Sequence, residues 1–409
     1  MARVEVVAPG ARGLRLVRPS EAGLRPRPAS EVAGRRNLTM LMGATAFLTA
    51  GGLIMVLSAS SVSAYAQYGS SFLFFQRQAA YAVVGTVALL VTSRMRYDAW
   101  QRLAVPFLGL TVVLLALVLH PTAGIEAYGS SRWISLGPVT IQPSELAKLA
   151  LVVFVATVLA RKWNRMDEPT HSALPLLPVT VLVCGMVILQ PDLGTAVILA
   201  GSVFLLVFAA GVRLRYLAAA GIVGGAIGFA LIMGEGYRRA RFLSFLHPWA
   251  DAKNTGYQLI QSLIALGSGG WFGVGLGTSR QKWMYVPNAH TDFIFSILGE
   301  ELGLVGEIVV LLAFGVLIYA GIRIAARAPD VFGRLLASGI VSWFGLQIVV
   351  NLGAVTGLLP ITGVPLPMLS YGGSSLVVSL AAVGILVNIA KAGAPASRTG
   401  DTARARRTG

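Results

Sequence analysis

Residues 292–322 read DFIFSILGEELGLVGEIVVLLAFGVLIYAGI, and most of this stretch is apolar. An α-helix needs roughly 20 apolar residues to cross about 30 Å of hydrocarbon, so this segment is long enough to span a membrane. Because only helices and closed barrels satisfy their backbone groups in lipid, we expect an all-α polytopic membrane protein with ten transmembrane helices. The other nine apolar windows lie at about 38–58, 76–93, 101–119, 144–160, 173–190, 193–211, 215–233, 335–355 and 372–390.

The composition of the chain agrees with a membrane protein. Of its 409 residues, 55% are hydrophobic and 12% are charged, whereas soluble domains carry about 25% charged residues. The net charge is +16, but the sequence has no basic face studded with aromatic residues, so we expect no nucleic-acid partner. It also lacks a P-loop and the His and Cys spacings of metal sites, which argues against an ATPase or a zinc enzyme.

The distribution of basic residues predicts the orientation. With the amino terminus inside, 24 of the 33 Lys and Arg residues fall on the cytoplasmic side and eight on the outer side, as the positive-inside rule requires. Both termini are then cytoplasmic. Residues 1–37 and 392–409 are predicted to be disordered basic tails that flank a membrane domain over 38–391. Residues 234–291 form a large extracytoplasmic loop between the seventh and eighth helices.

Asp292 is well placed to act as a general base. It opens the eighth span at the mouth of the outer loop, where a carboxylate can stay ionised near water and face a membrane-embedded substrate. The alternative is structural, with Thr291 or Asp292 capping the amino terminus of the helix. Glu300 and Glu301 lie deeper in this span, and either is expected to pair with an internal Arg or Lys.

Two further motifs contain charged residues near the outer side. In QPSELAK (142–148), Glu145 and Lys148 can form an ion pair on one helix face, or Lys148 can contact substrate. In QPDLGTA (190–196), Asp192 stands where two spans break, either in a simple turn or in a site.

The segment 358–375 is rich in Pro and Gly and leads into the last span. Such a backbone at membrane depth either lines a cavity or forms a buried re-entrant turn, and Gln347 and Asn351 would face the same interior. Outer guanidinium groups can bind phosphate bidentately or extend to lipid headgroups. These groups belong to Arg77, Arg132 and Arg238 to Arg241.

Six motifs in a fixed order closely resemble the SEDS family of peptidoglycan polymerases over residues 38–391. Segment 57–81 and the sequence around Asp292 resemble the division branch, FtsW, more than the elongation branch, RodA. The motifs are GSSRWISLG (129–137), QPSELAK (142–148), QPDLGTA (190–196), GYQLIQSLIALGSGG (256–270), NAHTDFIFSILGEELG (288–303) and PLPMLSYGGSS (365–375).

This resemblance implies a peptidoglycan glycosyltransferase that polymerises lipid II into β-1,4 glycan strands on the outer face of the bacterial cytoplasmic membrane, at the division septum. The transfer would invert the anomeric configuration, with Asp292 as general base. Arg, Lys or a divalent cation such as Mg²⁺ or Mn²⁺ could neutralise the leaving group. Many members carry Glu where this chain has Asn288, so a carboxylate that could help bind a metal is missing here, and metal dependence stays open. The candidate substrate-binding residues are Arg77, Arg132, Glu145, Lys148, Gln258, Gln261, His290, Ser370 and Arg241.

The resemblance also implies partners. A class B penicillin-binding protein would cross-link the new strands, and other divisome proteins would join it. Two other functions compete with the enzyme: a lipid II flippase, which needs groups reachable from both sides, and a non-catalytic scaffold, for which Asp292 is dispensable. Because the polar motifs cluster on the outer side, the sequence favours the enzyme.

Overall fold

A computed structural model of the chain describes residues 28–120, 124–127, 130–137, 139–165, 174–283 and 285–393. Most of these residues are helical. The helices are α1 (Pro28–Tyr68), α2 (Leu73–Arg94), α3 (Tyr97–Val118), α4 (Pro143–Arg161), α5 (Leu177–Leu189), α6 (Leu193–Ala209), α7 (Leu214–Met233), α8 (Gly236–Leu246), α9 (Tyr257–Ser268), α10 (Ile294–Ala326), α11 (Val331–Val355) and α12 (Gly373–Ala392).

Eight of the described helices are long and apolar enough to cross a membrane, namely α1 to α4, α7 and α10 to α12. The prediction of a helical membrane protein with many spans is therefore confirmed. The other two predicted windows coincide with shorter apolar helices, Leu174–Leu189 and Leu193–Ala209. Helix α1 begins at Pro28, inside the segment predicted to be a tail, and the rest of both tails lies outside the described residues.

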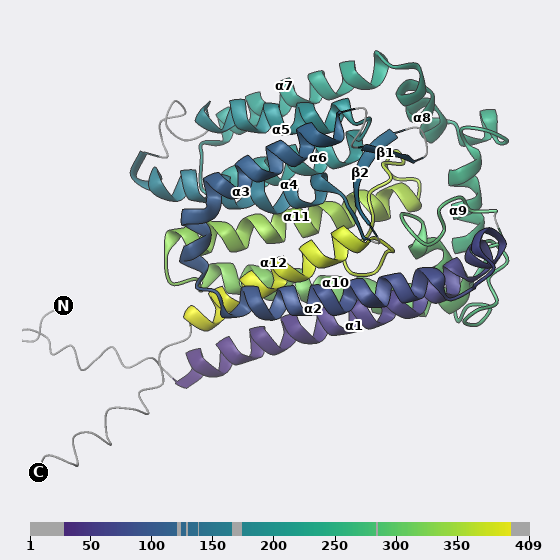
Figure 1. Cartoon of the computed structure of the whole chain (residues 1–409), viewed down its shortest axis with the longest axis horizontal. Helices are drawn as coiled ribbons and strands as arrows, with labels where there is room; N and C mark the ends of the chain where they lie inside the picture. Colours follow the sequence, from purple (N-terminus) through teal and green to yellow (C-terminus); the bar gives the residue numbers. More distant parts are fainter. Residues whose placement is uncertain are drawn as a thin grey trace, which may run out of the picture.

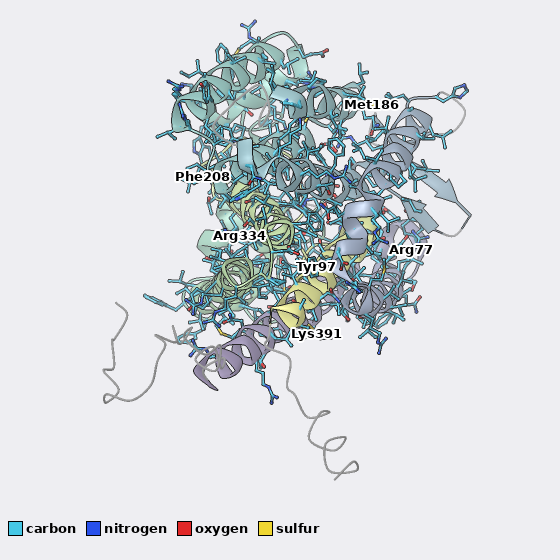
Figure 2. All side chains as sticks on the ribbon, turned by 90° about the vertical axis from the view of Figure 1, so that its left-hand side faces the viewer. Arg77, Tyr97, Met186, Phe208, Arg334 and Lys391 are labelled. Atoms are coloured by element: carbon cyan, nitrogen blue, oxygen red, sulfur yellow. The ribbon has the colours of Figure 1, made fainter. Side chains whose placement is uncertain are left out.

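The long helices run side by side (Figure 1), and side chains fill the space between them (Figure 2). The centre consists of α4, α11 and α12, whose most apolar windows are 78%, 67% and 67% buried. By contrast, α7 lies along one edge of the bundle (Figure 1) and its window is 6% buried. The start of α1 and the end of α12 lie at one end of the bundle, while α8 and α9 lie at the other.

A small antiparallel sheet interrupts the helical architecture between α3 and α4. Its strands are β1 (Gly124–Ala127), β2 (Ser130–Leu136) and β3 (Val139–Ile141), in the order β1-β2-β3. The sequence did not predict this sheet, because β1 and β3 have only four and three residues and apolar periodicity over so few residues is a weak signal. It brings Arg132 on β2 to the amino-terminal end of α4.

Helix α10 is broken at Gly303, whose φ of 67° and ψ of −170° leave the helical region. A glycine-rich segment, residues 269–282, packs on the break. Its amides donate to the carbonyl groups of Glu300 and Glu301, and its carbonyl groups accept from Leu304 and Val305. Since an unsatisfied backbone group is costly in lipid, these bonds explain how an interrupted helix is tolerated here.

Candidate active site

Asp292 lies directly before α10 and is 8% exposed. The Thr291 hydroxyl donates to its Oδ1 at 2.8 Å, and the Asn351 side-chain amide donates to its main-chain carbonyl at 2.8 Å. The N-cap residue of α10 is Phe293, and no described side chain caps this helix. The alternative interpretation of Thr291 or Asp292 as a helix cap is therefore wrong.

Burial raises the pKa of the Asp292 carboxyl, while the hydrogen bond from Thr291 and the positive charge of Arg241 oppose that rise. Arg241 lies on α8, where its guanidinium group is 5.7 Å from the ring centroid of Tyr237. A carboxylate of raised pKa is a stronger base, which suits proton abstraction near neutral pH. The structure thus brings together two candidates from distant parts of the sequence.

The segment between α11 and α12 forms a wall beside Asp292. The Asn351 amide donates to the Val364 carbonyl at 2.7 Å, and the Gln347 amide donates to the Pro365 carbonyl at 2.7 Å. These bonds confirm that Gln347 and Asn351 face the same interior. A Cβ atom added at Gly363 would come within 3.9 Å of Asp292 Oδ2, so the wall closely approaches the carboxylate.

Ser370 and Gln78 hold the end of this wall. Ser370 is 4% exposed, and its hydroxyl oxygen accepts a bond from the Leu366 amide at 2.9 Å. Gln78 on α2 donates to the Ser370 carbonyl and accepts from the Gly372 amide. Ser370 therefore shapes the wall through the backbone. Sequence reasoning missed Gln78, although a glutamine within an apolar span was a usable signal.

Lys148 and Glu145 form the predicted ion pair, with 2.8 Å between Lys148 Nζ and Glu145 Oε2. Their side chains are 1% and 2% exposed. Lys148 also donates to Gln347 Oε1 at 2.9 Å and lies 5.4 Å from the centroid of the Trp343 ring. The pair thus supports α11 and, through Gln347, the wall, while its burial does not favour direct contact with substrate.

An aromatic cluster forms around His290, which precedes Asp292 by two residues in the sequence. The His290 ring stacks on Phe74 with 4.8 Å between centroids, and Tyr371 lies 5.4 Å from the same imidazole. Burial lowers the pKa of His290 to about 4, so the ring is neutral at physiological pH. Arg77 is exposed, and its positive charge acts on the Tyr371 hydroxyl, so a cation lies at the edge of the cluster.

Arg132 and Asp192 meet at the turn between α5 and α6. Arg132 donates to the carbonyl groups of Gln190 and Pro191, and 3.9 Å separates its Nη1 from Asp192 Oδ2. The Asp192 carboxylate accepts bonds from the Thr195 amide and hydroxyl and caps α6. Of the two roles proposed for Asp192, a turn or a site, these contacts fit the turn. Arg132 stabilises the same turn.

Gln258 and Gln261 lie on α9 and are half-buried. The Gln258 amide donates to the Pro287 carbonyl at 3.4 Å, a long bond to the segment that leads into Asp292. Asn288 in that segment has a φ of 55° and accepts from Thr291. Asparagine tolerates this left-handed conformation better than most residues, which gives a structural reason for its presence.

Glu300 and Glu301 both bond with the glycine-rich segment, but the predicted pairing with a basic side chain is seen for Glu301 alone among the described contacts. Glu300 accepts from the Arg280 amide at 2.9 Å and from the hydroxyl of Ser279. Glu301 accepts from the Ser58 hydroxyl at 2.6 Å, and its Oε1 lies 3.5 Å from Lys282 Nζ. Both carboxylates therefore fasten the segment to the break in α10.

Comparisons with known proteins give a consistent result. A family model for FtsW, RodA and SpoVE, described as a cell cycle protein, matches residues 38–394. A probable peptidoglycan glycosyltransferase FtsW of Geobacter metallireducens is 45% identical over 87% of this chain and 94% of its own length. The stage V sporulation protein E of Bacillus subtilis is 42% identical over 86% of this chain and 96% of its own length.

Solved structures show the same fold. A chain from a study of how a peptidoglycan synthase complex coordinates polymerization and crosslinking is 33% identical, with a TM-score of 0.69. The alignment covers 86% of this chain and 97% of that chain. The rod shape determining protein RodA of Thermus thermophilus is 32% identical, with a TM-score of 0.64 over 86% of this chain and 96% of its own.

Proposed function

This chain belongs to the FtsW, RodA and SpoVE family of cell cycle proteins, and on that premise we propose that it is a peptidoglycan glycosyltransferase that polymerises lipid II at the division septum. The relatives named as FtsW support both the activity and the division role. The observation that carries the assignment is the buried Asp292 carboxylate at the outer end of α10.

The reaction needs one base on the acceptor side. Asp292 takes the proton of the acceptor 4-hydroxyl as that oxygen attacks the anomeric carbon of the donor glycan. The bond from that carbon to the undecaprenyl diphosphate oxygen breaks at the same time, and the diphosphate leaves. Because the donor linkage is α and attack comes from the opposite face, the product linkage is β.

Charge that develops on the leaving diphosphate has to be neutralised. Arg77 at the edge of the aromatic cluster and Arg241 near Asp292 supply cations for this purpose. No group of three His, Cys, Asp or Glu side chains comes together among the described residues. A divalent cation such as Mg²⁺ or Mn²⁺ is the alternative source of positive charge at the leaving diphosphate.

The proposed topology has ten spans, with α5 and α6 added to the eight long helices. At 1.5 Å per residue these two helices are shorter than the hydrocarbon core of about 30 Å. Neighbouring parts of the protein therefore have to shield the backbone groups at their ends from lipid. Basic residues such as Arg334 and Lys391 lie at the end where α1 starts and α12 ends (Figures 1 and 2). That end is cytoplasmic by the positive-inside rule, and α8 and α9 belong to the large extracytoplasmic loop.

The proposed partner is a class B penicillin-binding protein with transpeptidase activity, acting with other divisome proteins. Support comes from the similarity to a chain of a peptidoglycan synthase complex. A partner that cross-links strands would act on the glycan as it leaves the outer face.

The assignment is tested with purified protein in vesicles that contain fluorescent lipid II and the candidate partner. The enzyme produces glycan ladders from lipid II. A flippase moves lipid II between leaflets without forming polymer, and a scaffold does neither, so either of these results would contradict the proposal.

A further inference from the structure

An apolar groove of about 400 Å³ lies between α1 and α10, within the range of about 300 to 1,000 Å³ that is usual for ligand pockets. Its described lining consists of apolar side chains and glycines. Phe47, Gly51 and Met55 contribute from α1, and Leu298 and Val305 contribute from α10. Nothing polar in this lining would repel a hydrocarbon chain.

Neighbouring side chains leave the groove open. A Cβ atom added at Gly51 would meet no atom within 4 Å. Phe272 and Leu276 come from the glycine-rich segment and also line the groove, yet they are 82% and 55% exposed. The groove can therefore accept a ligand without displacing core residues.

The groove adjoins the candidate active site. Leu369 lines it, and two residues later the Tyr371 amide donates to the His290 carbonyl at 2.9 Å. Leu298 also lines it and lies in the first turns of α10, which Asp292 directly precedes. The groove and the candidate active site therefore share the wall formed between α11 and α12.

The length of the groove matches one leaflet of a membrane. From Phe47 to Met55, α1 rises by about 12 Å, and half of the hydrocarbon core is about 15 Å. The lining on α10 is in the part of the helix that follows Asp292, so the groove extends inward from the outer side. A lipid chain that enters from the outer leaflet would follow this direction.

We propose that this groove binds the polyprenyl chain of a lipid-linked substrate. The proposal rests on the proposed function, because polymerisation of lipid II joins two molecules that each carry such a chain. An isoprenoid chain has no polar atoms, so burial of its apolar surface supplies the binding energy. Its diphosphate then lies toward Tyr371 and Arg77, where the Arg77 guanidinium supplies positive charge.

The first test fills the groove with a side chain. Gly51→Leu places a leucine in the open space, and Gly43→Leu is a matched control on the same helix, since Gly43 also has open space but does not line the groove. With undecaprenyl-linked lipid II, Gly51→Leu raises KM about tenfold, equivalent to about 1.4 kcal/mol, and leaves kcat unchanged. Equal KM values in the two variants would overturn the proposal.

A second measurement does not depend on filling the groove. A photoreactive p-benzoylphenylalanine replaces Phe272, which is exposed at the groove, and the variant is irradiated in vesicles containing phospholipid and lipid II. Crosslinks to lipid II that decrease with added undecaprenyl phosphate support the proposal, whereas crosslinks to phospholipid alone overturn it. Absence of polymer from the wild-type protein would instead contradict the proposed function.

Discussion

At the scale of single residues, the environment of Asp292 combines two opposing influences. Burial raises the pKa of its carboxyl, and the Arg241 charge and the Thr291 hydroxyl lower it. A base has to be deprotonated before it can accept a proton, so this balance sets the lowest pH at which the enzyme works. Burial lowers the pKa of His290 to about 4, so this ring is neutral at physiological pH and adds no charge there.

Arg241→Ala tests this balance. Loss of the positive charge lets the pKa of Asp292 rise further, so Asp292 loses its proton only at higher pH. We expect the acid limb of the pH profile of kcat/KM to move to higher pH, while Arg238→Ala on the same helix leaves it in place. An unchanged acid limb in Arg241→Ala would show that Arg241 does not influence the pKa of Asp292.

Lys148→Met tests the buried ion pair. The substitution leaves the Glu145 carboxylate buried without its partner, which typically costs about 3 to 5 kcal/mol. We expect that loss in the free energy of unfolding, measured in detergent by denaturant titration. The double variant Glu145→Gln with Lys148→Met removes both charges and should recover much of the loss; equal destabilisation of both variants would argue against the charge explanation.

At the scale of elements, the break in α10 and the glycine-rich segment form one unit. Gly269 and Gly303 allow backbones to touch: a Cβ atom at Gly269 would lie 1.9 Å from the Gly299 carbonyl oxygen, and one at Gly303 would lie 2.4 Å from the Gly273 nitrogen. The unit also fixes the start of α10, which Asp292 precedes.

Gly269→Ala should therefore destabilise the protein. The added methyl group forces the segment away from α10, and overpacking of this kind costs about 1 to 3 kcal/mol. Gly267→Ala is the control, because a Cβ atom there would meet nothing within 4 Å. Thermal unfolding in detergent measures both, and a melting temperature for Gly269→Ala equal to that of the control would contradict the close contact.

The sequence predicts some of these features better than others. Long apolar windows located the spans because a membrane helix needs many consecutive apolar residues, and the pairing of Glu145 with Lys148 followed from helix geometry. The break at Gly303 gave no such signal, since an isolated glycine is tolerated in membrane helices. The aromatic cluster was also hidden, because Phe74, His290 and Tyr371 are distant in sequence.

At the scale of the whole molecule, the helices that hold the candidate site lie at the centre of the bundle, and the most exposed helix lies at its edge. Central helices α4, α11 and α12 are largely buried and hold the wall beside Asp292, whereas α7 lies at the edge. The proposed polar site is at one end of the bundle, and the basic residues that set the orientation are concentrated at the other.

The orientation is testable with a membrane-impermeant maleimide. After replacement of the free Cys184 by Ala, a new cysteine is introduced either at Asn254, in the proposed outer loop, or at Pro329, between α10 and α11; both positions are exposed. We expect labelling of Asn254→Cys in intact cells and of Pro329→Cys only after lysis. The reverse pattern would invert the topology and place Asp292 inside.

The central claim is that Asp292 is the base of a lipid II polymerase. The most direct measurement compares glycan ladders made by the wild type, Asp292→Asn and Asp192→Asn, each purified with the same partner. Asn at position 192 can still cap α6, so this control keeps its fold and should keep its activity, whereas we expect Asp292→Asn to lose about 100-fold or more. Undiminished ladders from folded Asp292→Asn protein would contradict the claim.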